Sequence, residues 1–204
     1  MRNFLAGIFL TLVLVAVGGV VFIYSGLFDV AASNPHSAVV GWVLETARNR
    51  SIEVQAAGIS VPQGLDDPAK VLIGTEHFAA HCAVCHGAPG VPKGDIARGL
   101  NPQPLDLTHS ASHYSPSELF WIVKHGIRMT GMPSWGDHSD EELWATVSFL
   151  KKLPGMTEQD YAKLIAASRA QGGHHHDGHE PEPGTAVAEP PGAPAHDKTP
   201  GHHH

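Results

Sequence analysis

The two cysteines of the chain, Cys82 and Cys85, lie three residues apart, and a histidine stands on either side of the pair. Such a group suits three kinds of chemistry: a redox disulfide, a zinc site, or the covalent attachment of haem. Together with His86 the cysteines have the C-x-x-C-H spacing. Two thiols one helical turn apart add across the two vinyl groups of one haem, and the adjoining imidazole ligates its iron. This spacing favours haem.

The redox disulfide and the zinc site each require a feature that the sequence does not show. A disulfide of the thioredoxin type is expected in a βαβ context, and the neighbouring sequence predicts no strands. A zinc ion needs four ligands, which Cys82 and Cys85 could supply together with His77, His81 or His86. Structural zinc sites usually take a second ligand pair from a separate segment, and no such pair precedes residue 171. Both alternatives remain open on sequence alone.

A second axial ligand is needed if haem iron is to carry electrons rather than bind substrates. The best candidate is Met132, because Gly131 and Pro133 place it in a tight turn, and a thioether ligand raises the reduction potential. Met129 lies nearer a helix and is interpreted as a core residue. His113 and His125 are candidate nitrogen ligands, although an exposed or capping role suits them better. His77 and His81 have the i, i+4 spacing of helical metal ligands but are predicted to face solvent.

The elements that must position these residues are predicted to be helical. A helix over residues 71–86 ends at the cysteines, and a long Gly- and Pro-rich loop follows over residues 87–107. Ser115 and Ser139 each begin a helix as N-caps with a glutamate three residues later; the first helix ends at Gly126 and the second before Pro154. A short helix over residues 157–170 comes last. The predicted fold class is therefore all-α.

The N-terminal region predicts a membrane anchor. Residues 4–24 carry no charge, and 21 residues of helix span about 31 Å, roughly the thickness of the hydrocarbon layer. Arg2 favours a cytoplasmic N-terminus. A cleaved signal peptide, with its cleavage site at residues 30–32, is the alternative. A short amphipathic helix is predicted over residues 37–50 and an extended segment over residues 51–62.

Composition sets further bounds. The net charge is −7 and no run of Lys or Arg occurs, which argues against a nucleic-acid partner. Residues 171–204 have almost no large apolar side chains and are predicted to be disordered, with histidines that suit divalent metals. The predicted organisation is an anchor (1–28), a juxtamembrane helix and linker (29–70), a folded domain (71–154), a short helix (155–170) and the His-rich tail (171–204).

The folded segment resembles a known family. Gly74 and Phe78 before the cysteine motif, the Gly131-Met132-Pro133 turn and Phe149-Leu150 near the end together resemble the class I cytochrome c domain, over roughly residues 70–154. The resemblance implies one covalent haem c, with His86 and Met132 as axial ligands. It also implies that Gly74 packs against Phe149 and that a loop carbonyl, that of Pro89, holds the His86 ring. Upstream, the chain is more loosely similar to membrane-anchored, single-haem bacterial cytochromes.

The resemblance implies an electron-transfer protein that is not itself an enzyme, acting alone or as a subunit of an oxidoreductase complex. We expect a one-electron carrier in a respiratory or other periplasmic chain, anchored in the bacterial inner membrane with its haem domain in the periplasm. Its partners would be a dehydrogenase, an oxidase or another cytochrome. Residues 101–107 and Trp121 are expected to wall the haem crevice, and the candidate docking residues are Lys93, Arg98, Lys124 and Arg128. A haem-based sensor and a haem-free periplasmic metal-binding protein are the alternative functions.

Overall fold

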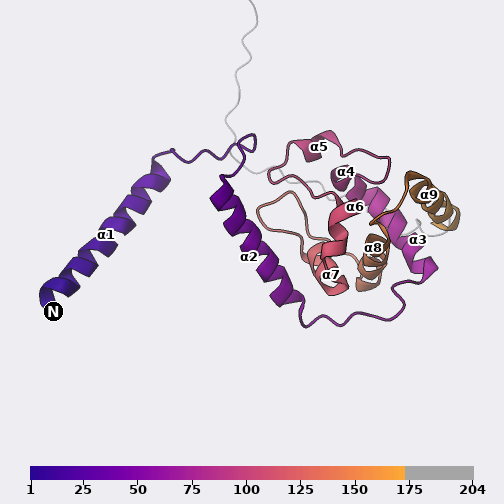
Figure 1. Cartoon of the computed structure of the whole chain (residues 1–204), viewed down its shortest axis with the longest axis horizontal. Coiled ribbons are helices and arrows are strands. Elements are labelled where there is room, and N and C mark those ends of the chain that lie inside the picture. Colours follow the sequence, from indigo (N-terminus) through magenta and orange to yellow (C-terminus); the bar gives the residue numbers. More distant parts are fainter. Residues whose placement is uncertain (173–204) are drawn as a thin grey trace, which may run out of the picture. The chain divides into compact units, whose positions relative to one another are not determined.

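The computed structural model describes residues 1–172 (Figure 1). Two of its helices begin and end at the residues that local signals in the sequence predict. Helix α7 (Pro116–His125) is capped by the Ser115 hydroxyl, and Glu118 accepts a hydrogen bond from the Ser115 N–H at 2.7 Å. Helix α8 (Asp140–Lys152) repeats this capping box with a serine and a glutamate of its own. Both predicted boxes are confirmed. The described residues contain no strand, only one isolated bridge between Ala88 and Val91, so the all-α class is also confirmed.

The helix that carries the cysteines has three parts. Helix α3 (Pro68–His77) begins where Asp67 accepts a hydrogen bond from the Ala69 N–H at 2.9 Å. A π-helical turn, η1 (Phe78–Cys82), follows, and α4 (Ala83–His86) completes the segment. Gly87 has a φ of 71°, which ends the helix. The sequence predicted the helix and its end, but its start lies three residues earlier and the π turn was not predicted.

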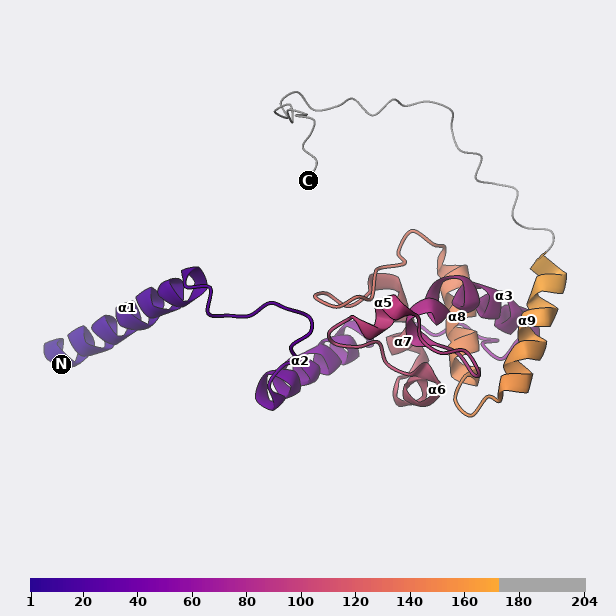
Figure 2. The same cartoon turned by 90° about the horizontal axis from the view of Figure 1, so that it is seen from above.

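The core forms where α3 packs against α8 and α9 (Glu158–Gly172), as Figures 1 and 2 show. Gly74 of α3 lies so close to α8 that a Cβ there would be 1.9 Å from the carbonyl oxygen of Ala145. The predicted close approach of Gly74 is confirmed, but the backbone of Ala145 is the nearest partner instead of Phe149. The Phe149 ring packs instead on Phe78, with centroids 4.9 Å apart.

Helix α2 (Ala38–Ala56) is longer than predicted, because residues 51–56 are helical and not extended. Its buried side chains, Ile52 and Ala56, come from this extension, and α2 packs against α7. The apolar residues that suggested the shorter helix, among them Val40 and Leu44, are exposed. Burial of Ile52 and Ala56 in the folded domain thus extends α2 beyond residues 37–50, the segment in which the spacing of apolar residues predicted a helix.

Helix α1 (Arg2–Tyr24) is long and apolar enough to cross a membrane, and no residue of its most apolar stretch is buried. The predicted disorder and metal binding of residues 171–204 fall almost wholly outside the described residues. Between α4 and α7 the chain forms only short elements: α5 (Asp95–Arg98), α6 (Leu107–Ser110) and the 3₁₀ turn η2 (Ala111–His113).

Candidate functional site

Cys82 ends the π turn and Cys85 lies in α4, and both are free thiols, partly buried. Burial, with a smaller contribution from the charge of Cys85, raises the pKa of the Cys82 thiol to about 12. A zinc ligand and a redox-active cysteine both act as the thiolate. A protonated Cys82 is a weak nucleophile, so these surroundings disfavour the redox-disulfide alternative.

His86 is held in one tautomer by the loop that follows it. Its Nδ1 lies 2.8 Å from the carbonyl oxygen of Leu105, which can only accept, so Nδ1 donates and Nε2 keeps its lone pair. Burial lowers the pKa of His86, the bond to Leu105 opposes this, and the charge of Lys93 lowers the pKa again. A neutral imidazole with its second nitrogen fixed by an acceptor is the usual form of a metal-ligating histidine. The carbonyl expected from Pro89 is therefore that of Leu105.

Internal hydrogen bonds position the loop that carries Leu105. The Gly94 N–H donates to the Val84 carbonyl at 2.9 Å, and a Cβ on Gly94 would lie 2.9 Å from that same oxygen. The Lys93 ammonium group donates a hydrogen bond to the carbonyl of Pro104, one residue before Leu105. These contacts bring the far end of a loop of about twenty residues back onto α4.

Met132 lies in a turn closed by three hydrogen bonds. Thr130 Oγ1 donates to the Ile127 carbonyl at 2.7 Å and accepts from the Met132 N–H at 3.1 Å, while the Ile127 N–H donates to the Met132 carbonyl at 3.2 Å. Met129 has a φ of 60° and is 90% exposed. Its interpretation as a core residue is wrong, because the tight turn directs its side chain outward.

The loop after α4 and the Met132 turn touch each other. A Cβ on Gly131 would lie 2.4 Å from Leu100 Cδ1, so the absence of a side chain at Gly131 makes room for Leu100. The segments next to His86 and Met132, far apart in the sequence, are thereby joined. The role of Met132 as a ligand stays a prediction.

Residues 69–150 match the family model described as cytochrome C oxidase, cbb3-type, subunit III. They form a class I cytochrome c domain. The matched part of the cytochrome c domain runs from the first turn of α3 into the last turn of α8 and includes both loops described above. The family implies a c-type haem and electron transfer. No curated protein matches the chain.

The donor set of this cytochrome c domain fits a haem. Two free thiols lie one turn apart, a neutral imidazole has an unprotonated nitrogen, and a thioether sits on a loop that contacts the loop holding that imidazole. Trp121, expected to wall the crevice, is partly buried with its ring 5.2 Å from that of His125. His125 and His113 are exposed, as expected for residues that are not ligands.

The basic side chains proposed for docking take part in local bonds. Lys124 pairs with Asp140 at 2.6 Å, and Arg98 pairs with Asp95 of the same short helix. Arg128 is exposed. These contacts leave the docking role a prediction.

The structure also brings together residues that the sequence analysis did not connect. His77 is partly buried and not solvent-facing: its ring lies 4.8 Å from that of His138 and 4.7 Å from that of His81. His138 is 61 residues away in the sequence, and no local pattern pairs it with α3.

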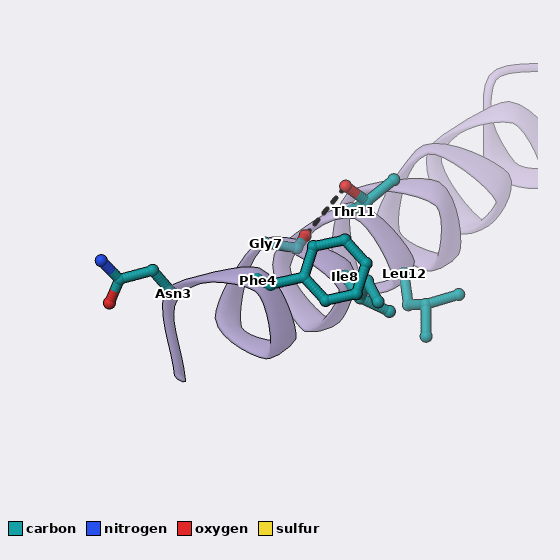
Figure 3. A pocket seen from close by; sticks show the side chains of 6 residues that line it. All are labelled: Asn3, Phe4, Gly7, Ile8, Thr11 and Leu12. Atoms are coloured by element: carbon teal, nitrogen blue, oxygen red, sulfur yellow. Dashed lines mark hydrogen bonds between the residues drawn. The ribbon is translucent and has the colours of Figure 1, made fainter. Parts of the chain in front are cut away.

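A concave surface along the first turns of α1 carries no candidate site. It is the outer face of one apolar helix, and the Thr11 hydroxyl on it donates to the Gly7 carbonyl at 3.0 Å (Figure 3). The residues that line it are Asn3, Phe4, Gly7, Ile8, Thr11 and Leu12.

Proposed function

We propose that the protein is a membrane-anchored one-electron carrier with a single haem c, attached through Cys82 and Cys85 and ligated by His86 and Met132. The observation that supports this most is the hydrogen bond from His86 Nδ1 to the Leu105 carbonyl. It leaves Nε2 with a free lone pair on the residue that directly follows Cys85.

The bound haem supplies a one-electron couple between ferrous and ferric iron. The residues of the chain do the rest. The two cysteines fix the group to α4, Leu105 keeps His86 in its ligating tautomer, and the turn around Met132 holds a sulfur ligand that favours the reduced state. Hydrogen bonds within both loops limit rearrangement between oxidation states.

The family and α1 support the partners and the location that we propose. The matched family is named for an oxidase subunit, so an oxidase complex is the first candidate partner, with a dehydrogenase or another cytochrome as further candidates. Helix α1 serves as a single-pass anchor in the bacterial inner membrane and keeps the haem domain, residues 71–154, on the periplasmic side.

Haem staining after denaturing electrophoresis tests the attachment. The full chain, produced in cells with working cytochrome maturation, should stain, and the double variant Cys82→Ala/Cys85→Ala should not. Only covalent haem survives the gel, so an unstained wild-type band would overturn the proposal.

The distal ligand is tested by a matched pair of methionine variants. Met132→Ala should remove the weak far-red charge-transfer band that a Met–ferric haem shows, and the reduced protein should then bind CO. Met129→Ala, which changes an exposed methionine in the same turn, should keep the band. A wild-type protein that lacks the band and binds CO readily would favour a sensor instead.

A further inference from the structure

Three histidines gather beside α3, apart from the residues assigned to the haem. This histidine cluster consists of His77, His81 and His138. His77 lies between the other two, and the rings of His81 and His138 are 5.7 Å apart. The indole of Trp135 lies 5.0 Å from the His81 ring and 5.5 Å from the His138 ring, and so covers part of the cluster.

The protonation of His77 follows from its contact with Thr146. The Thr146 hydroxyl donates its one proton to the Glu142 carbonyl at 3.0 Å. It must therefore accept from His77 Nδ1, which lies 3.0 Å away. Nδ1 carries the proton, and His77 Nε2 has a free lone pair. Thr146 is fully buried, so this arrangement is fixed.

The lone pair on His77 Nε2 faces the Nδ1 atom of His138. His77 Nε2 and His138 Nδ1 are 3.4 Å apart, a long hydrogen bond in which the Nδ1–H of His138 donates to the lone pair of His77. Two imidazole nitrogens, each about 2.0–2.1 Å from one tetrahedral metal ion, lie roughly 3.4 Å apart. The observed separation is that of two neighbouring ligands.

We propose that His77 Nε2 and His138 Nδ1 bind a divalent transition-metal ion of the Zn²⁺ or Cu²⁺ class, with His81 as the third ligand. In residues 1–172 no three ligating side chains already converge on one point, so the exposed His81 ring turns inward when the ion binds and water completes the shell. A set of nitrogen donors selects these ions over Mg²⁺ and Ca²⁺.

Electrostatics agree with this assignment. Burial, together with the neighbouring charges of His81 and His138, lowers the pKa of His77 to about 4, while the charge of Glu142 acts in the opposite direction. His77 is therefore neutral at pH 7, and an incoming cation does not have to displace a proton from it. Thr146 supplies the oxygen acceptor that typically holds the other nitrogen of a ligating histidine.

Isothermal titration of Zn²⁺ into the haem-loaded full chain tests the site. His138→Ala should bind one equivalent fewer than wild type. His109→Ala, which changes an exposed histidine outside the cluster, should lose none. All three proteins keep the same histidines beyond residue 172, so binding there cancels in the comparison. Equal stoichiometry and affinity in wild type and His138→Ala would overturn the proposal.

A second pair of variants leaves the ligands in place. Thr146→Val removes the acceptor of His77 Nδ1 and should weaken Zn²⁺ binding at the cluster about 10–100-fold, whereas Thr146→Ser keeps the hydroxyl and should bind as wild type does. An unchanged haem spectrum shows that each variant is folded. If His138→Ala does not fold, His138→Gln takes its place. Wild-type Zn²⁺ binding by both His138→Gln and Thr146→Val would leave only a histidine–histidine contact.

Discussion

The closest contact between α3 and α8 gives the sharpest test of the fold. Gly74→Ala adds one carbon at a point where the neighbouring atoms belong to the backbone of α8. That carbon would lie 1.9 Å from the Ala145 carbonyl oxygen and 2.5 Å from the carbonyl carbon. A peptide group inside a helix cannot rotate away as a side chain can, so the two helices must separate.

Two opposing effects set the size of the change. Alanine favours a helix over glycine by about 1 kcal/mol. Ordinary contact of a Cβ begins near 3.4 Å, so the helices must move apart by about 1.5 Å along this direction. Overpacking typically costs about 1–3 kcal/mol, and a gap of this size forfeits much of the dispersion attraction along the interface. We expect a net loss of about 2 kcal/mol or more in the free energy of unfolding.

Thermal unfolding of the full chain in detergent, followed by circular dichroism, measures this loss. For a domain of this length about 2 kcal/mol corresponds to a Tm lower by roughly 8–16 °C. Gly41→Ala is the matched control, because Gly41 lies inside α2 with no atom within 4 Å of its added Cβ. It should leave Tm unchanged or raise it.

A Tm for Gly74→Ala equal to or above that of wild type would refute the reasoning. It would mean that α3 and α8 do not approach as closely as described, or that their interface yields at little cost. A lower Tm in the Gly41→Ala control as well would show that the effect of alanine is not specific to the helix contact.

Three further predictions concern other contacts. Gly131→Ala should displace Leu100 and weaken the far-red band of the ferric protein. Adding Leu100→Ala should restore the band, since the three atoms nearest to the added Cβ all belong to the Leu100 side chain. Hydrogen bonds from Ser139, the N-cap of α8, hold the pKa of the Glu142 carboxyl below its usual value of 4.5. The ionised Glu142 therefore stabilises the folded state above about pH 4.5, and this stabilisation is lost as the pH falls through the lowered pKa. Between about pH 5 and about pH 3, Tm should decrease less in Glu142→Gln than in wild type. An equal decrease in both proteins would contradict this prediction. Ile52→Ala should lower stability by about 2–5 kcal/mol in a denaturant titration, whereas Val54→Ala, 57% exposed, should change it by less than about 0.5 kcal/mol.

Elements with local start and stop signals could be predicted from the sequence. The capping boxes that begin α7 and α8 consist of residues three apart, so their hydrogen bonds form within one turn and depend little on the rest of the chain. The extension of α2 could not be predicted in this way. Ile52 is helical because it is buried in the folded domain, and the local pattern around it carries no such information.

The candidate site divides in the same way. The spacing of Cys82, Cys85 and His86 is local and is visible in the sequence. The carbonyl that accepts the hydrogen bond from His86 is determined by how a loop of about twenty residues folds back. Only the structure therefore identifies it as the carbonyl of Leu105. The pairing of His77 with His138 joins elements 61 residues apart and required the packing of α3 on α8.

The π turn within the cysteine-bearing helix determines how the chain responds to a deletion there. The Ala83 N–H donates to the Phe78 carbonyl, five residues back, so this turn holds one residue more than an α turn. Deleting one residue, such as Ala80, would restore a regular α-helix. Four residues of α-helix turn through about 400°, close to what five residues of a π turn do, so Cys85 and His86 would keep nearly their present direction relative to Phe78. A single-residue deletion between Gly74 and Phe78, where the helix is α-helical, would instead rotate Cys85 and His86 by about 100° relative to Gly74. Deletion of Ala80 is therefore expected to be tolerated far better than that deletion.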